Sequence, residues 1–308
     1  MDKLKNDSLE ELTLEEKASL TSGKGFWNLQ GIRRLGIPSI TVSDGPHGLR
    51  KSLDGDGEDI LASEKATCFP TASALASTWD EALLETVGNT IAKEAKSKHV
   101  SVLLGPGANI KRHPYCGRNF EYYSEDPLLS GKMAASFIKG VQSEGVAAAL
   151  KHFVANNQES NRLVTDAIID ERTLREIYLK SFEIAVKEAD PASIMTAYNK
   201  VNGTYMSEHG KLVEDVLRDE WNFQGVMMTD WGGCNDRVTG LKNGQDLQMP
   251  GTGGSTDREI VEAITHNALD EAALDEASRR ILSLIENTSH VLEEQSPFDK
   301  QAHHAIAK

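Results

Sequence analysis

The sequence predicts an α/β fold, namely a TIM-type (β/α)8 barrel. Short apolar runs alternate with helical patterns along most of the 308 residues, and this alternation indicates a parallel sheet. About seven or eight such units follow one another without a break, which favours a closed barrel over a doubly wound sheet. No glycine-rich dinucleotide fingerprint follows a strand, so the Rossmann alternative is weaker. Irregularity is expected, if anywhere, in the first units of the barrel.

The amino-terminal third of the chain is the least regular part. A capping box at residues 13–16 predicts a short helix. A first strand is expected at 39–42, leading into the turn at 43–46. Residues 51–66 are polar and rich in glycine and aspartate, which predicts an excursion over the barrel mouth. Residues 71–77 are expected to form a second, weaker strand.

From residue 80 onward the pattern alternates regularly. Strands are expected at residues 100–104, 146–150, 193–197, 225–229 and 246–249. Helices are expected near residues 80–98, 128–144, 171–188, 208–220, 235–242, 257–266 and 270–287. The last segment, 294–308, breaks this pattern and is interpreted as a linker followed by the first turns of another helix. A helix with nothing after it is expected to leave its apolar face uncovered.

Composition limits the partners and the compartment. The formal net charge of −14 argues against nucleic acids and anionic membranes, because both need a positive surface. The three cysteines are Cys68, Cys116 and Cys234; they form no C-x-x-C pair, which argues against a disulfide framework or a zinc knuckle. Residues 1–16 are charged and no apolar stretch could span a bilayer. We expect a soluble, cytoplasmic protein that uses no metal or cofactor, although an exported protein without its leader would look the same.

Three of the apolar runs end in polar side chains. The run at 225–229 ends in Asp230 and Trp231, and the run at 193–197 ends in Tyr198. Catalysis in (β/α) barrels is built at the carboxyl ends of the strands, so these residues are candidates for the site. A buried carboxylate such as Asp230 needs a partner, but it could equally cap the following helix. Trp231 could be a core residue or a platform that stacks on a sugar.

The run at 146–150 ends in two adjacent candidates, Lys151 and His152. Neighbouring strand residues point to opposite faces, so both could reach the site only where the strand ends or bulges. His152 could also be a core histidine with satisfied hydrogen bonds. Asp44 lies in a sequence that forms an ordinary turn equally well.

Two arginines lie in polar loops that follow strands. Arg118 belongs to a basic loop that could be an ordinary solvated surface. Arg162 ends the amide-rich run 156–162, which suggests hydrogen bonds to a polyhydroxylated ligand but is also compatible with a plain polar loop. Many donors, a few carboxylates and an aromatic side chain together suit a neutral sugar. No histidine pair with metal-ligand spacing and no phosphate-binding loop occurs.

Together these residues resemble the amino-terminal catalytic domain of glycoside hydrolase family 3, on its β-glucosidase branch. The resemblance covers roughly residues 10–290, nearly the whole chain. Its motifs are specific in combination and lie at Ser43–Arg50, Leu104–Arg112, Gly117–Pro127, Lys151–Phe153, Asn157–Arg162, Met195–Asn199 and Thr229–Trp231. The domain division that follows is a barrel over 1–290, with residues 291–308 as a linker and the start of a missing carboxyl-terminal α/β sandwich domain.

The resemblance implies a retaining O-glycosyl hydrolase of β-glucosidase type that acts on a small-molecule glycoside. Asp230 matches the family nucleophile, which forms a covalent glycosyl-enzyme and which neighbouring cations would keep ionised. Asp44 matches the carboxylate that binds hydroxyls of the terminal sugar. The further sugar-binding groups that the resemblance implies are Arg118, Lys151, His152, Arg162, Tyr198 and Trp231.

Two departures from the family pattern leave alternatives open. Gln248 stands where relatives often carry Glu, at a position expected to be structural. The general acid/base is not visible, because on this branch the resemblance implies a Glu from the sandwich domain, so activity is expected to be weak. The alternatives are a sugar-binding barrel or a subunit completed by another chain, and a β-N-acetylhexosaminidase, β-xylosidase or phosphorylase of the same family. Self-association into a homo-oligomer is also an expectation.

Overall fold

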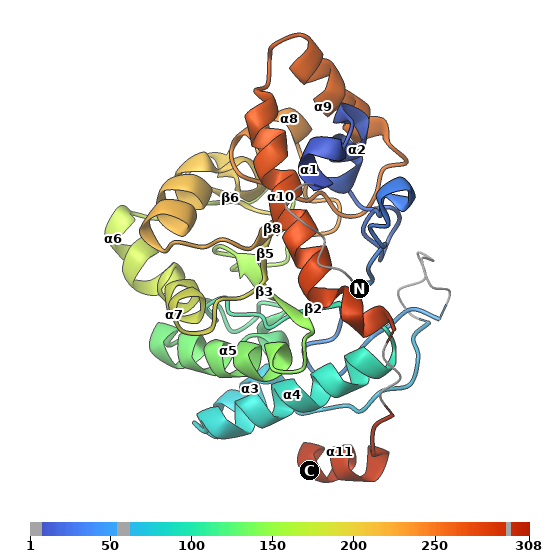
Figure 1. Ribbon diagram of the computed structural model, residues 1–308. Helices are drawn as coiled ribbons and strands as arrows, with labels where there is room; N and C mark the ends of the chain where they lie inside the picture. Colours follow the sequence, from blue (N-terminus) through green and yellow to red (C-terminus); the bar gives the residue numbers. More distant parts are fainter. Residues whose placement is uncertain (1–7, 54–61, 294–296) are drawn as a thin grey trace.

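Five parallel strands form the centre of the molecule, in the order β1-β2-β3-β5-β8 (Figure 1). The computed structural model describes residues 8–53, 62–293 and 297–308. The strands are β1 (Val42–Asp44), β2 (Val102–Leu104), β3 (Ala147–Phe153), β5 (Ser193–Thr196) and β8 (Val226–Thr229). A small second sheet is formed by β4 (Asp166–Ala167), β6 (Lys200–Val201) and β7 (Thr204–Tyr205). The predicted parallel α/β architecture is confirmed.

Helices connect and surround the strands. The α-helices are α1 (Ser8–Glu11), α2 (Leu14–Leu20), α3 (Ala72–Ala76), α4 (Glu81–Ser97), α5 (Pro127–Gln142), α6 (Glu171–Thr173), α7 (Lys180–Ala189), α8 (Arg237–Lys242), α9 (Ser255–Thr265), α10 (Glu271–Thr288) and α11 (Lys300–Ala307). The 3-10 turns are η1 (Arg33–Leu35), η2 (Asn119–Glu121), η4 (Met206–Glu208) and η6 (Ser289–Leu292), and the π-helical stretches are η3 (Leu174–Tyr178) and η5 (Lys211–Glu220). The helices predicted from residue 80 onward are all present.

The strands are buried on both faces, and their side chains alternate between two cores. Leu103, Ala148 and Ile194 face outward and pack with helices such as α4 and α5. Val102 and Met195 face inward and belong to a second cluster that fills the centre of the barrel. This period of two explains why the strands read as continuous apolar runs, as parallel strands covered on both faces do.

The ring is closed by single bridges instead of full strands. Met228 on β8 pairs with Leu247, Gln248 pairs with Ser22, and the segment around Asn28 pairs antiparallel with the residues before β1. The strand predicted at 246–249 is therefore reduced to isolated bridge residues. The barrel class is confirmed; the expected irregularity of the first units is present, and the strand predicted at 246–249 is irregular as well.

Segment 71–77 does not form the predicted strand. Thr71 caps α3, because its hydroxyl accepts a hydrogen bond from the amide of Ala74. The following alanines and leucine favour a helix, and Leu75 and Ala76 are buried. The capping box at Thr13 is present as predicted, with hydrogen bonds in both directions.

The last helix, α11, packs below α4 (Figure 1). His303 is 5% exposed, and its Nδ1 lies 2.8 Å from Oε1 of Glu94 on α4. Ile306 and Ala307 pack against the outer core. The expectation that this helix leaves its apolar face uncovered is therefore wrong. Residues 1–7 of the charged amino terminus, 54–61 of the polar excursion and 294–296 of the linker lie outside the described residues.

Candidate active site

Asp230 lies at the carboxyl end of β8 and is the centre of the candidate site. It is 9% exposed. Its Oδ1 accepts a hydrogen bond of 2.8 Å from the backbone amide of Trp231. Its Oδ2 is buried but accepts no hydrogen bond from any residue that the structure describes. A buried carboxylate oxygen without a donor is costly for stability and is therefore a sign of function.

The environment of Asp230 sets its ionisation. Burial raises the pKa of this carboxyl above its ordinary value, and the charges of Arg118 and Lys151 oppose the rise. Nη1 of Arg118 lies 3.8 Å from Oδ2, which is too far for a hydrogen bond. The cations therefore limit the effect of burial, as the sequence suggested, but they do not reverse it.

Arg118 lies just before η2, in the long loop that follows β2. Its Nη2 lies 2.7 Å from Nε2 of His152, and its Nε donates to Oε1 of Glu121. Burial lowers the pKa of Arg118, but Tyr122, Glu121 and Asp230 outweigh this, so that its pKa is raised and it stays charged. The basic loop is thus not an ordinary solvated surface at this position.

His152 is 1% exposed and is held in one neutral form. Burial and the nearby cations lower its pKa well below the ordinary value. Because arginine can only donate, Nε2 must accept from Arg118, and Nδ1 therefore carries the proton and donates to Oη of Tyr122 at 3.0 Å. Nε2 also lies 3.4 Å from Oδ2 of Asp230, but it has no proton to donate to that oxygen.

Lys151 faces the opposite end of the site. Its Nζ donates to Oδ1 of Asp44 at 2.9 Å, and Nη2 of Arg50 donates to Oδ2 at 3.0 Å. Burial raises the pKa of Asp44, but Lys151 and Arg50 outweigh it and hold the pKa at about 2. Asp44 is therefore ionised at all ordinary pH values.

A bulge in β3 lets both adjacent residues serve the same site. Lys151 pairs with Met195 of β5, but Phe153 pairs with Thr196, so the register shifts between them. The extra residue, His152, also exchanges hydrogen bonds with the side chain of Asn109. Both candidates thus reach the carboxyl end of the barrel through the bulge that the sequence required.

The remaining candidates form the rim of the site. Tyr198 donates through its hydroxyl to the carbonyl oxygen of Trp231 at 2.8 Å. The guanidinium of Arg162 lies over the Tyr198 ring at 4.4 Å from the centroid, and its Nη1 bonds to Glu159. Trp231 donates through its indole nitrogen to the carbonyl oxygen of Phe26, which fixes the ring plane. The structure thus brings all eight candidates to one end of the barrel.

Sequence reasoning gave two further residues no place in the sugar site, although it named Glu121, together with Glu159, as a first candidate for the acid if the acid lies within this chain. Glu121 is 6% exposed and lies between Arg118 and Lys151, with its Oε2 3.8 Å from Nζ of Lys151. Tyr122 is fully buried and receives hydrogen bonds from His152 and Asn156. Glutamate three residues after arginine in a loop was the available signal, but that spacing alone does not predict burial.

Among the described residues, no group of three His, Cys, Asp or Glu side chains could hold a metal ion. No helix of the described chain is long and apolar enough to cross a membrane.

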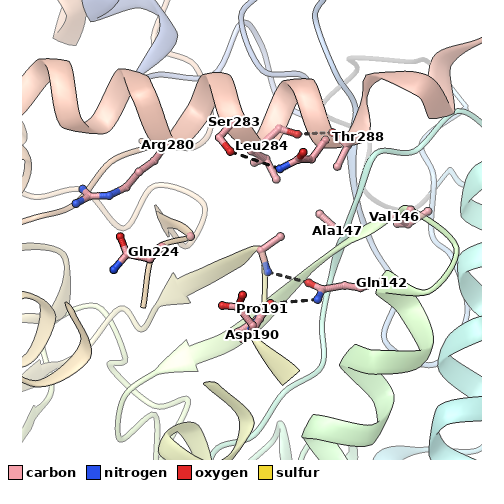
Figure 2. Close-up of a pocket in the computed structure, with 14 residues that line it drawn as sticks. Gln142, Val146, Ala147, Asp190, Pro191, Gln224, Arg280, Ser283, Leu284 and Thr288 are labelled. Carbon is pink, nitrogen blue, oxygen red and sulfur yellow. Dashed lines mark hydrogen bonds between the residues drawn. The ribbon is translucent and has the colours of Figure 1, made fainter. Parts of the chain in front are cut away.

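A hollow of about 330 Å³ lies at the opposite end of the barrel, between α10 and the starts of β3 and β8 (Figure 2). Gln142, which lines this hollow, already bonds to the backbone at Ala189, Asp190 and Ala192. The carboxyl end is therefore the better candidate.

The site combines charges of alternating sign with one unoccupied anionic oxygen. Such an arrangement can bind a neutral, polyhydroxylated ring through many donors and acceptors. Of the two oxygens of Asp230, Oδ2 is the one suited to attack an electrophilic carbon, because Oδ1 already accepts the backbone hydrogen bond of Trp231. The alternative that Asp230 is a helix cap is not observed, since Asp236 caps α8.

Known proteins resemble the chain over almost its full length. The model of the glycosyl hydrolase family 3 N terminal domain matches residues 30–284. The thermostable beta-glucosidase B of Acetivibrio thermocellus is 54% identical over 301 residues, and an exo-alpha-(1->6)-L-arabinopyranosidase of Bifidobacterium breve is 48% identical over 303 residues. Each alignment covers 97% of this chain but 40% of the relative, so the chain spans about two-fifths of their length.

Solved structures give the same result. The beta-glucosidase 3B of Thermotoga neapolitana in complex with glucose superposes with a TM-score of 0.92 at 45% identity, over 98% of this chain and 45% of that one. The beta-glucosidase of Kluyveromyces marxianus in complex with glucose gives 0.90 at 40% identity, over 97% and 37%. The barrel class predicted from sequence is thus shared with enzymes of known structure.

Proposed function

The chain belongs to glycosyl hydrolase family 3, and from this membership we propose that it is the barrel of a retaining glycosidase that removes a terminal β-linked D-glucose. The single observation that carries the proposal is the buried Oδ2 of Asp230, which has no donor among the described residues. A nucleophile needs a lone pair that no donor of the protein occupies, and no donor among the described residues lies within hydrogen-bond distance of this oxygen.

The proposed reaction proceeds in two steps. Oδ2 of Asp230 attacks the anomeric carbon, the bond to the leaving oxygen breaks with its electron pair, and that oxygen takes a proton from a general acid. Water then attacks the glycosyl ester, releases the sugar and restores the carboxylate. A raised pKa makes the Asp230 carboxylate a more basic nucleophile, and the charges of Arg118 and Lys151 oppose the rise that burial causes.

The other candidates are proposed to bind the sugar. Asp44 stays ionised and accepts hydrogen bonds from ring hydroxyls, and Lys151 beside it donates. Arg118 and His152 lie close enough to Asp230 to bind the hydroxyl next to the anomeric carbon. Hydrogen bonds to these hydroxyls can strengthen as the oxocarbenium-like transition state forms. Tyr198 and Trp231 then line the rim.

The acid/base is proposed to come from a carboxyl-terminal sandwich domain or from a complementing chain. The barrel alone is then expected to hydrolyse a dinitrophenyl glucoside, whose leaving group needs little protonation, far faster than cellobiose. Equal efficiency on both substrates would show that the acid lies within these 308 residues. Adding the purified sandwich domain of a relative should selectively raise the rate on cellobiose.

The sugar itself has a second candidate, α-L-arabinopyranose, because one relative is named for that activity. Nitrophenyl β-D-glucopyranoside and nitrophenyl α-L-arabinopyranoside decide between the two, since arabinopyranose lacks the hydroxymethyl group. β-Xylosides, N-acetylglucosaminides and added phosphate separate the other family activities.

The decisive test is covalent trapping. An activated 2-deoxy-2-fluoro-glucoside should add one fluoro-sugar per chain, and peptide mass spectrometry should place it on Asp230. A label on any other residue would overturn the nucleophile assignment. Binding of glucose without any labelling would favour a sugar-binding barrel instead.

A further inference from the structure

Glu121 occupies an unusual place between the two halves of the site. The charged groups form a string of alternating sign, which runs Asp44, Lys151, Glu121, Arg118, Asp230. Two links of this string are direct hydrogen bonds, the one from Lys151 to Asp44 and the one from Arg118 to Glu121. The links from Lys151 to Glu121 and from Arg118 to Asp230 are longer. Glu121 is the one carboxylate of this string that lies between the two cations of the string, Lys151 and Arg118.

The geometry shows what Glu121 does to Arg118. The guanidinium is held at Nε by Oε1 of Glu121 and at Nη2 by His152, and its Nη1 stops 3.8 Å short of Oδ2 of Asp230. Without Glu121, the favoured partner of Arg118 would be Asp230, because a direct guanidinium–carboxylate contact is stronger than a separated one. That contact would occupy the lone pair that attack requires.

We propose that Glu121 is a positioning residue that restrains Arg118 and Lys151 and thereby keeps the reactive oxygen of Asp230 unoccupied. The inference deepens the proposed function and rests on it for its kinetic consequence only. Glu121 does not act as the acid/base, because each of its oxygens faces a cation and it is almost fully buried.

Other charged groups around these residues do not replace Glu121. The groups that face Asp230 are Arg118, Lys151, His152 and Tyr198. Glu121 itself faces Arg118, Lys151 and the ring of His47, whose pKa burial lowers. Among the described residues, Glu121 is thus the one carboxylate placed to compete with Asp230 for Arg118.

The test is Glu121→Gln, which keeps the size and one acceptor but removes the charge. The carboxyl ¹³C resonance of Asp230, assigned by its loss in Asp230→Asn, should titrate about one unit lower in Glu121→Gln than in the unaltered chain. This readout needs no turnover. An unchanged Asp230 titration would overturn the proposal, whether or not the chain is a glycosidase.

Kinetics supply the second readout. In Glu121→Gln the acidic limb of the fluoro-sugar labelling rate should move to lower pH, and the maximal rate should fall about 10- to 100-fold because Arg118 blocks attack. Glu121→Asp keeps the charge and should restore the position of the acidic limb. If the unaltered chain is not labelled at all, the proposed function fails while the titration still decides the role of Glu121.

The matched control is Glu94→Gln. Glu94 is also a fully buried glutamate, held by the amide of Thr67 and by His303, but it lies on α4 beside α11, away from the residues of the site. This variant should lower thermal stability and leave the titration of Asp230 unchanged. An equal shift in both variants would mean that loosened packing, and not the charge of Glu121, moves Asp230.

Discussion

Two buried aspartates flank the same strand, β8, and their surroundings are opposite. Asp246 lies at the amino end and is 1% exposed. Its Oδ2 accepts from Arg218 and from the amide of Met227, both at 2.7 Å, and its Oδ1 accepts from Arg280 at 2.9 Å. At the carboxyl end, Asp230 has one backbone donor and one oxygen with none.

The difference separates a structural carboxylate from the proposed nucleophile. Burying a carboxylate costs free energy unless hydrogen bonds and opposite charges compensate it, and at Asp246 every oxygen is compensated. At Asp230 only one oxygen is compensated by a hydrogen bond. The proposed role explains this difference, because a fully bonded oxygen could not attack a substrate. Burial alone therefore does not identify a catalytic residue; Asp230 combines burial with an unmet acceptor and a place at the carboxyl end of a barrel strand.

Asp230→Asn should produce the largest effect. We expect loss of turnover by at least about 10⁴-fold on aryl glucosides, because the amide cannot form the glycosyl ester. The fold should remain, as judged by circular dichroism and melting temperature. Turnover within tenfold of the unaltered chain would show that Asp230 is not the nucleophile. The difference between Asp230 and Asp246 would then not be one of function.

Asp246→Asn should have the second largest effect, and on stability instead of chemistry. It leaves Arg218 buried beside Arg280 without a carboxylate, which typically costs about 3–5 kcal/mol of unfolding free energy. Urea denaturation measures this loss, and labelling of the remaining folded fraction should proceed at the normal rate. If Asp246→Asn is labelled more slowly but is as stable as the unaltered chain, then Asp246 serves the reaction and not the stability of the fold.

The sequence predicted the surroundings of Asp230 better than those of Asp246. Asp230, Lys151 and His152 were found because each follows an apolar run, and the carboxyl ends of parallel strands meet at one face. The adjacency of two candidates predicted that β3 either ends or bulges at Lys151 and His152, and the structure has the bulge. These features depend on local order and on one general rule of barrels.

Features that depend on distant pairing were not predictable from the sequence. Glu121 becomes a site residue only because β2 and β3 bring it beside Lys151, and α11 is covered only because His303 meets Glu94, 209 residues away. The misassigned strand at 71–77 reflects a short apolar segment in which periodicity cannot separate helix from strand. Asp246 was read as the start of a strand, since nothing local marks its two arginine partners.

A third prediction concerns Asp44, the charged residue at the other end of the string. Its pKa is about 2 in the folded chain against an ordinary 3.8, so its ionisation contributes about 2 kcal/mol of stability at neutral pH. A depressed pKa gives stability that is present above pH 4 and lost as the pH falls toward 2. Asp44→Asn should therefore be less stable at pH 7, and the difference from the unaltered chain should shrink on acidification. A constant difference would mean that packing, and not charge, accounts for it.

Asp230 should show the reverse dependence, with the smallest effect. Its pKa is raised in the folded state, so the protonated form is favoured by folding, and stability is fully present below the ordinary value of 3.8 and declines as the pH rises through the raised value. Asp230→Asn removes that decline, so the stability of the variant relative to the unaltered chain should rise as the pH increases from below 3.8 to 7. Melting curves of both proteins in matched buffers measure the difference. A variant that instead loses stability relative to the unaltered chain as the pH rises would show that Arg118 and Lys151 outweigh the burial of Asp230. The carboxylate would then be stabilised by folding, and the physical basis proposed for its reactivity would be removed.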